Sequence, residues 1–440
     1  MKLCVKMAAA AALLWTLPSP AFAESAATVN KGDTAWMLIA TVLVLLMILP
    51  GLALFYGGLS RSKNMLSVMT QVGGAAALAM LLWVAWGYSL AFGSDAPGLL
   101  RPFVASLDKL FLAGVTPETT AATFSEGVAI PEYAFVSFQM TFAAITAALV
   151  LGAVVERIRF AAVLLFTAIW LTIVYVPIAH MVWAGSGLFF GMGALDFAGG
   201  TVVHVNAGVS ALVACLMVGK RIGYPREPMP PHSLTLTMAG TGLLWVGWFG
   251  FNAGSALEAN GVAALAMINT FVAAAAGGLA WMVAERLAGH KGSALGFCSG
   301  VVAGLVAVTP AAGNSGPLGA ILLGAVASAI CYLFVARVKV RLGFDDSLDA
   351  FGIHGIGGMI GAIGTAVVYQ PWLGGPGDGT TQLASQLLIQ FATVATTVAW
   401  SAVGTALALS AAKRITTLRP AADQEREGLD ITDHGERAYN

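Results

Sequence analysis

The chain alternates between long apolar runs and short stretches that are polar or contain glycine and proline. A helix that crosses a hydrocarbon core about 30 Å thick needs roughly 20 residues at about 1.5 Å each. Eleven runs approach this length, at approximately Thr34–Phe55, Thr70–Phe92, Ala134–Val155, Phe160–Ile178, Gly200–Val218, Ser233–Phe251, Gly261–Val283, Ser293–Val308, Gly316–Ala336, Phe351–Val368 and Gln382–Ala412. The pattern predicts an all-α integral membrane protein with eleven transmembrane helices, the last unusually long.

Composition agrees with a membrane protein. Only 10% of the residues are charged, against roughly 25% in soluble proteins. The 52 glycines are an excess expected where membrane helices approach closely. The net charge is zero and there is no long basic run, so a nucleic-acid partner is excluded.

The basic residues predict the orientation. If the N-terminus lies outside, seventeen of the 22 Lys and Arg residues fall on the inner side, and only Lys31, Arg101 and Lys109 fall in the outer segments. Positive residues gather on the cytoplasmic side, and a missed helix would exchange the sides of all later loops. We therefore expect an N-out, C-in protein of the inner (cytoplasmic) membrane.

The first 23 residues are typical of a signal peptide. Lys2 and Lys6 precede an apolar stretch too short to span a membrane, and Ala21-Phe22-Ala23 fits a cleavage site. An uncleaved short anchor is the alternative. We expect residues 24–412 to form the membrane domain and residues 413–440 a cytoplasmic tail.

Eleven spans divide into five, five and one. A unit with an odd number of spans returns inverted when it is repeated, an architecture in which the transport pathway lies between the halves. Weak similarity supports this: Leu195-Asp196-Phe197-Ala198-Gly199 precedes His204, and Leu348-Asp349-Ala350-Phe351-Gly352 precedes His354. We predict an inverted five-helix pseudo-repeat followed by a long eleventh helix.

His204 and His354 are the ionisable residues that the predicted spans place deep in the membrane, one in each half. Ionisable side chains there cost a few kcal/mol, which makes them functional candidates. They could be two separate histidines bonded to backbone carbonyls. They could also be a neutral imidazole pair lining a narrow pathway, because desolvation favours the uncharged ring. The second interpretation favours a small, neutral, hydrogen-bonding substrate.

Aromatic residues gather towards the predicted outer side. Trp183 follows the fourth run, Trp248 and Phe251 lie near the end of the sixth, and Phe142 lies on the third. With the hydroxyl of Ser255, these rings could hold a small cation without any carboxylate. The alternative is the aromatic belt found at membrane interfaces.

Nothing in the sequence indicates an enzyme. There is no HExxH, the two histidines lack carboxylate or thiolate co-ligands at metal-site spacing, and Cys215, Cys298 and Cys331 stand singly inside apolar runs. We expect no catalytic site, no cofactor and no metal.

Several strings in order along the chain resemble the ammonium transporter (Amt/Mep/Rh) family, and the match is close to the bacterial Amt-type members. They are Phe138–Phe142 (FQMTF), Glu156–Phe160 (ERIRF), Ile178–Trp183 (IAHMVW), Ala194–Asn206 (ALDFAGGTVVHVN), Gly247–Ser255 (GWFGFNAGS), Gly304–Pro310 (GLVAVTP), Asp349–Gly355 (DAFGIHG) and the tail from Glu425 to Asn440. The resemblance covers essentially the whole chain after the signal peptide.

The resemblance implies a pathway for ammonium. Phe142, Trp183 and Ser255 match an outer recruitment site, and Phe142 with Phe251 matches a stacked pair that blocks the pore mouth. The twin histidines of the family's lumen are matched by His204 and His354. The family would recruit ammonium outside, deprotonate it and conduct ammonia inward.

Two further positions follow from the resemblance. Trp248 is similar to a pore-wall residue near the gate. Asp196 matches a family aspartate near the outer site, which is better interpreted as capping the fifth helix than as touching the cation.

The resemblance also implies partners: a homotrimer with one pore in each subunit, and a PII-like signal-transduction protein at the cytoplasmic face, with methylammonium as a substrate analogue. The tail residues Glu425–Asp430 and His434–Glu436 match the family pattern, and a disordered, solvated tail is the alternative. A sensor that binds ammonium and signals with little transport would share every pore motif, so it stays open as an alternative function.

Overall fold

The computed structural model describes residues 28–377 and 379–439, and the predicted signal peptide lies outside them. In the described part, eleven helical segments are long and apolar enough to span a membrane. The predicted fold class, an all-α membrane protein with eleven spans, is confirmed. The segments are Lys31–Leu59, Ser62–Phe92, Glu132–Ala153, Phe160–Gly191, Gly200–Val218, Leu234–Gly254, Gly261–Leu287, Ala294–Ala311, Pro317–Leu342, Phe351–Val368 and Leu383–Ile415.

Most of these segments are divided into shorter helices by local changes of pitch. The α-helices are α2 (Lys31–Leu46), α3 (Ala53–Leu59), α4 (Met65–Leu82), α5 (Tyr88–Phe92), α6 (Glu132–Val150), α7 (Phe160–Trp170), α8 (Val176–Trp183), α9 (Leu188–Gly191), α10 (Asn206–Val218), α11 (Leu234–Gly254), α12 (Gly261–Leu287), α13 (Ala294–Val308), α14 (Pro317–Leu333), α15 (Lys339–Leu342), α16 (Ile356–Val368), α17 (Leu383–Ile415), α18 (Ala422–Glu427) and α19 (Leu429–His434). Single π-helical turns join several of them, and two others, η8 (Gly200–Val205) and η11 (Phe351–Gly355), open the spans that continue as α10 and α16.

Three of the predicted spans have an end misplaced by more than four residues. The second begins at Ser62 instead of Thr70, the fourth runs on to Gly191 instead of ending at Ile178, and the ninth runs on to Leu342 instead of ending at Ala336. Trp183 is therefore the last residue of α8 and does not follow the span. A polar residue such as Ser62 at a helix end interrupts the apolar run but not the helix, so hydropathy alone places such ends poorly.

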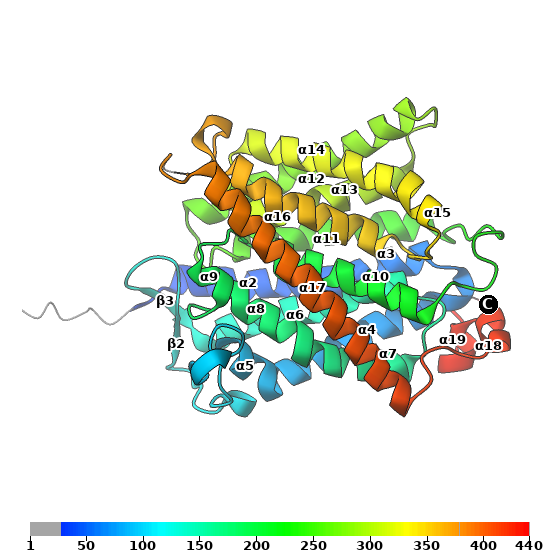
Figure 1. Cartoon of the computed structure of the whole chain (residues 1–440), viewed down its shortest axis with the longest axis horizontal. Helices are drawn as coiled ribbons and strands as arrows, with labels where there is room; N and C mark the ends of the chain where they lie inside the picture. Colours follow the sequence, from blue (N-terminus) through cyan, green and yellow to red (C-terminus); the bar gives the residue numbers. More distant parts are fainter. Residues whose placement is uncertain (1–27, 378, 440) are drawn as a thin grey trace, which may run out of the picture.

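The two ends of the bundle carry different structures (Figure 1). At one end, here named the strand end, β1 (Thr28–Val29) pairs parallel with β3 (Val128–Pro131), which pairs antiparallel with β2 (Thr120–Ala122). The other end, here named the tail end, carries α18 and α19 (Figure 1). Any pathway between the two sides of a membrane has to connect these ends.

The long α17 runs obliquely across one face of the bundle (Figure 1). Its buried side bears hydroxyl groups that bond to α10: Ser401 Oγ donates to Asn206 Oδ1 at 2.8 Å, and Thr405 Oγ1 donates to Ser210 Oγ at 2.8 Å. Hydrogen bonds of this kind hold helices together in a membrane, where apolar burial between helices adds little. They fix α17 against the helix that follows His204.

The two halves meet at a pair of glycines. A Cβ placed on Gly208 in α10 would lie 2.2 Å from the backbone nitrogen of Gly355, and one placed on Gly358 in α16 would lie 3.0 Å from Cβ of His204. Each glycine follows the histidine of its own half by four residues, so it lies one helical turn further along. The glycines let the two histidine-bearing segments touch backbone to backbone.

The C-terminal segment is folded onto the tail end. Leu429 N donates to Asn64 Oδ1 at 2.8 Å, and Glu425 Oε1 accepts from Ile222 N at 2.8 Å. Leu429 is fully buried. The alternative of a disordered, solvated tail is wrong for its described residues. The α17 helix continues to Ile415, past the predicted end of the membrane domain at Ala412.

Candidate functional site

An aromatic cluster lies where three helices approach the strand end. Phe142 comes from α6, Trp183 ends α8, and Ser255 caps the C-terminus of α11. The rings of Phe142 and Trp183 meet edge to face with centroids 5.7 Å apart. Trp183 Nε1 donates to the carbonyl oxygen of Asp196 at 2.9 Å, which fixes the indole.

The hydroxyl of Ser255 is already oriented. Its hydrogen is donated to the carbonyl oxygen of Phe251 at 2.9 Å. A hydroxyl carries one hydrogen and two acceptor lone pairs, so the oxygen of Ser255 can only accept from a further partner. Next to aromatic faces, such an oxygen suits a small cation that carries N–H groups.

Below this cluster, Phe142 and Phe251 face each other. Their rings are stacked, with centroids 4.2 Å apart and planes 12° from parallel, and both side chains are buried. Phe251 also lies 6.0 Å, centroid to centroid, from His204. The stack therefore separates the aromatic cluster from the two histidines.

The two predicted pathway histidines are in contact. His204 on η8 and His354 on η11 place their Nδ1 atoms 3.2 Å apart, with ring planes 24° from parallel. Trp248 stacks on His204 with centroids 5.4 Å apart. Of the two interpretations open from the sequence, the structure has the paired rings and not two separate histidines.

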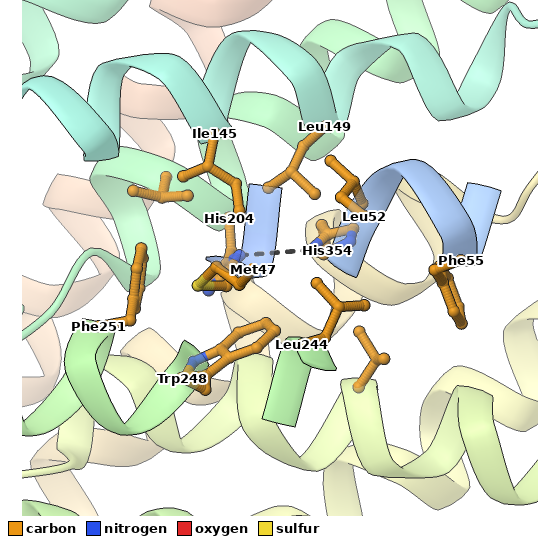
Figure 2. Close-up of a pocket in the computed structure, with 12 residues that line it drawn as sticks. Met47, Leu52, Phe55, Ile145, Leu149, His204, Leu244, Trp248, Phe251 and His354 are labelled. Carbon is orange, nitrogen blue, oxygen red and sulfur yellow. Dashed lines mark hydrogen bonds between the residues drawn. The ribbon is translucent and has the colours of Figure 1, made fainter. Parts of the chain in front are cut away.

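A small cavity lies along these rings (Figure 2). Its volume is about 10 Å³, which is the space of about one water-sized molecule. Figure 2 shows Phe251 and Phe55 at opposite ends of the row, with His204 and His354 between them. The wall is otherwise almost entirely apolar, and is formed by Met47, Leu52, Ile145, Leu149, Val203, Leu244, Trp248 and Val302.

A wider cavity lies beyond Phe55, towards the tail end. It has a volume of about 320 Å³ and shares Phe55 with the small cavity. Ile353, the neighbour of His354, also lines it. The described residues thus form a row that runs from an aromatic cluster, past a stacked pair and two histidines, into an open vestibule.

Each histidine-bearing segment begins at a buried aspartate. Asp196 accepts from the backbone nitrogens of Gly199, Thr201 and Val202 at 3.0, 2.9 and 3.2 Å. Carboxylates at a helix N-terminus satisfy its free N–H groups and suit the positive end of the helix dipole. Asp196 therefore holds the start of η8, the segment that carries His204.

The matching residue in the second half is Asp346, not Asp349. Asp346 accepts from the backbone nitrogens of Ala350 and Phe351 at 3.0 and 2.8 Å, whereas Asp349 forms an ion pair with Lys339. Asp346 precedes His354 by eight residues, as Asp196 precedes His204. The predicted match of Asp349 to Asp196 was shifted by three residues because it relied on similar letters and not on spacing.

A comparison with known protein families identifies the family of this chain. Residues 35–439 match the model of the Ammonium Transporter Family. The chain belongs to the ammonium transporter family. An ammonium transporter of Aquifex aeolicus is 46% identical over 417 residues, which cover 94% of this chain and 95% of the relative. One of Bacillus subtilis is 43% identical over 412 residues, with 93% and 99% covered.

Solved structures have the same fold as this chain. The crystal structure of Candida albicans Mep2 superposes with a TM-score of 0.80 at 36% identity, covering 90% of this chain and 87% of the other. A structure titled "Sensor Amt Protein" superposes with a TM-score of 0.82 at 28% identity, covering 92% and 98%. The resemblance found in the sequence is confirmed.

Three residues of the candidate site were missed from the sequence. Thr309 bonds to both Trp248 and His204, Phe55 ends the small cavity, and Asp346 holds η11. The eight-residue spacing could have found Asp346. A single Thr or Phe inside an apolar run carries no signal of its own, since only the fold places it beside the histidines or the cavity.

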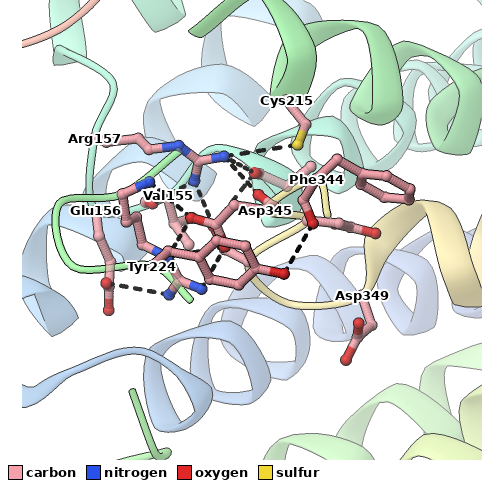
Figure 3. A network of polar contacts seen from close by, with 12 residues as sticks. Val155, Glu156, Arg157, Cys215, Tyr224, Phe344, Asp345 and Asp349 are labelled. Atoms are coloured by element: carbon pink, nitrogen blue, oxygen red, sulfur yellow. Dashed lines mark hydrogen bonds and ion pairs between the residues drawn. The ribbon is translucent and has the colours of Figure 1, made fainter. Parts of the chain in front are cut away.

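An ionic cluster lies at the tail end of the bundle (Figure 3). Arg221 binds Asp345 with Nη2 and Oδ1 2.7 Å apart and Glu156 with Nη1 and Oε2 3.3 Å apart. Arg157, fully buried, donates to the carbonyl oxygen of Asp345 at 2.6 Å. Burial alone would raise the pKa of Asp345, but hydrogen bonds and charge from Arg221, with charge from Arg157, hold that pKa below its usual value. The cluster joins the loops after α6, α10 and α15.

Proposed function

We propose that this protein carries ammonium nitrogen across the cytoplasmic membrane. Ammonium is recruited at Phe142, Trp183 and Ser255, loses a proton at the stacked pair of Phe142 and Phe251, and crosses as ammonia past His204 and His354. The family supports the substrate. The observation that carries the mechanism is the change from an aromatic cluster to a cavity of about 10 Å³ with almost no polar wall.

The recruitment step is supported by the chemistry of the aromatic cluster. A cation is attracted to the faces of Trp and Phe by about 0.5–2 kcal/mol each, more when water is excluded. Ser255 presents lone pairs, since its hydrogen is donated to Phe251. Potassium shares the charge of ammonium but has no N–H group to donate to that oxygen.

The neutral crossing is supported by desolvation. A bare cation between apolar walls loses its hydration, which costs many kcal/mol, whereas ammonia can keep a hydrogen bond with the imidazole pair. Trp248 forms part of that wall by stacking on His204. Asp196 has a structural role, because its carboxylate already accepts hydrogen bonds from the backbone of η8.

Purified protein in liposomes tests this function. We expect uptake of ammonium and of its analogue methylammonium, with ammonium competing and potassium failing to compete. His204→Ala and His354→Ala, singly and together, should alter methylammonium uptake or its selectivity. If all three variants behaved like the parent, the assignment of the twin histidines would be wrong.

The proposal also covers the orientation, the processing and the partners of the chain. The strand end faces outside and the tail end the cytoplasm, in the inner membrane, with residues 1–23 removed as a signal peptide. The chain forms a homotrimer with a pore in each subunit, and a PII-like protein docks at the tail end. Cysteine labelling of intact cells tests the orientation: Glu126→Cys should react with an impermeant reagent and Arg226→Cys should not, and the reverse would overturn it.

A sensor is the second candidate function, because the chain superposes on the structure titled "Sensor Amt Protein". A sensor would bind ammonium at the same aromatic cluster but pass little of it. Liposome uptake separates the two: ammonium binding without uptake supports the sensor, and uptake that saturates with ammonium supports the transporter.

A further inference from the structure

Thr309 is a buried residue beside the twin histidines at which several hydrogen bonds meet. It follows α13 directly, and its side chain is completely buried. Three polar groups meet at its hydroxyl oxygen: the carbonyl oxygen of Leu305 at 2.8 Å, Nε1 of Trp248 at 3.0 Å and Nε2 of His204 at 3.3 Å. No other side chain in the described structure bonds both to a pathway histidine and to the tryptophan stacked on it.

The hydrogens at this oxygen can be counted. A threonine hydroxyl has one hydrogen and two lone pairs. The carbonyl of Leu305 can only accept, so it takes the single hydrogen of Thr309. The indole nitrogen of Trp248 can only donate, so it fills one lone pair. The remaining lone pair faces Nε2 of His204, which therefore has to carry a hydrogen.

The count then extends to the second ring. A neutral imidazole carries one hydrogen, so His204 with its hydrogen on Nε2 has a bare Nδ1. The hydrogen bond between the two Nδ1 atoms, 3.2 Å apart, must be donated by His354. The hydrogen of His354 is then on Nδ1, and its Nε2 is bare. The His354 ring lines the small cavity.

We propose that Thr309 is a positioning residue that fixes the tautomers of both histidines. The hydrogen lies on Nε2 of His204 and on Nδ1 of His354, and Nε2 of His354 is the acceptor that the pair offers to an N–H group of the substrate. This inference rests on the proposed function for the identity of that substrate. It does not follow from the pairing of the rings alone, which allows either ring to donate.

With the tautomers fixed, the two ends of the histidine pair differ in whether they can accept a proton. On the side of Trp248, His204 presents only a hydrogen that Thr309 already accepts, so a proton arriving there finds no lone pair. Beyond the pair, His354 accepts. For a proton to pass along the rings, both tautomers would have to reverse and the hydroxyl of Thr309 would have to turn away from Leu305. Thr309 thereby opposes proton passage without presenting any charge.

Nitrogen NMR of the full-length protein in liposomes tests the assignment. With ¹⁵N-labelled histidine, protonated and unprotonated ring nitrogens give separate resonances, and the His204→Ala and His354→Ala variants identify which signals belong to each ring. We expect Nε2–H for His204 and Nδ1–H for His354 in the parent. Thr309→Ser, which keeps the hydroxyl, should give the same pattern.

Thr309→Val keeps the shape but removes the acceptor. The ratio of the Nε2–H form of His204 to its Nδ1–H form should fall by about fivefold or more, the change expected from the loss of one net hydrogen bond. Trp248→Phe is the matched control, because it removes a neighbouring donor and leaves the hydroxyl. A bare Nε2 on His204 in the parent, or a parent-like pattern in Thr309→Val, would overturn the proposal.

The same vesicles keep this inference separate from the proposed function. Ammonium uptake together with the reversed tautomers refutes the role of Thr309 alone. The expected tautomers in vesicles that take up no ammonium refute the transport function alone. If Thr309→Val does not fold, the spectra of the parent and of Thr309→Ser still decide the assignment.

Discussion

Replacing Gly208 by alanine should separate the twin histidines without touching either ring. The added Cβ would lie 2.2 Å from the backbone nitrogen of Gly355 and 2.4 Å from its Cα. Both are backbone atoms of the segment that carries His354, so no side chain can turn aside to make room. One of the two crossing segments has to move.

The size of the movement follows from the contact. Ordinary Cβ contacts begin near 3.4 Å, so the 2.2 Å contact has to open by about 1.2 Å. If η11 moves as a unit, the 3.2 Å distance between the two Nδ1 atoms grows beyond 4 Å, too long for a hydrogen bond. Overpacking of this kind costs about 1–3 kcal/mol of stability, so the protein should still fold.

Methylammonium uptake into liposomes, with the midpoint of thermal unfolding in detergent, measures both effects. We expect uptake to fall by at least about tenfold, since displacements near 1 Å in a site can reduce rates about a hundredfold. The matched control is Gly242→Ala in α11, where an added Cβ meets nothing within 4 Å. Uptake by Gly208→Ala equal to that of this control would refute the reasoning.

Three further predictions concern the tail end. Arg221→Ala leaves the buried carboxylate of Asp345 without its main partner, so we expect the free energy of unfolding to fall by about 3–5 kcal/mol in denaturant titrations; a loss under about 1 kcal/mol would contradict this. Because the pKa of Asp345 is lowered in the folded state, its stabilisation is complete above the unfolded value near 3.9 and is lost as the pH falls through the folded value. The parent should therefore lose more stability than Arg221→Ala below about pH 4, and parallel curves would argue against the ion pair. Asn64→Ala removes the acceptor of Leu429 N, a buried bond worth about 1–3 kcal/mol, so limited proteolysis should cut the tail faster; unchanged protection would mean that this bond does not hold it.

Much of the fold could be predicted because the membrane sets the length of every helix. Apolar runs of about 20 residues and the distribution of 22 basic residues are one-dimensional signals, and eleven spans follow from them. Helix ends were predicted less well. Ser62 begins the second span and Trp183 ends α8, because polar and aromatic residues at an interface stay helical while the average hydropathy falls.

In the candidate site, too, some residues could be predicted from the sequence and others could not. His204 and His354 could be found because ionisable residues are rare in a membrane, but their 3.2 Å contact depends on two helices crossing at Gly208 and Gly358. Hydropathy treats those glycines like any other small residue. Thr309 could not be found from the sequence. Its role depends on three hydrogen bonds, two to distant helices and one to its own helix.

The capping aspartates show how a signal can be present and still be misread. Similar letters around Asp196 and Asp349 favoured one match, and the equal spacing to the histidines favoured another, with Asp346. The structure has the second match, because hydrogen bonds to a helix N-terminus depend on the position of the carboxylate along the chain. Spacing to a functional residue is therefore a better guide between inverted repeats than local identity.

The narrowness of the passage between Phe251 and Phe55 also bears on pharmacology. A cavity of about 10 Å³ is far smaller than the roughly 300–1,000 Å³ that drug-sized molecules occupy. The vestibule at the tail end, at about 320 Å³, reaches the lower limit of that range. Compounds that inhibit this protein should therefore plug the vestibule beyond Phe55, and chemical libraries should be screened with access to that side of the membrane.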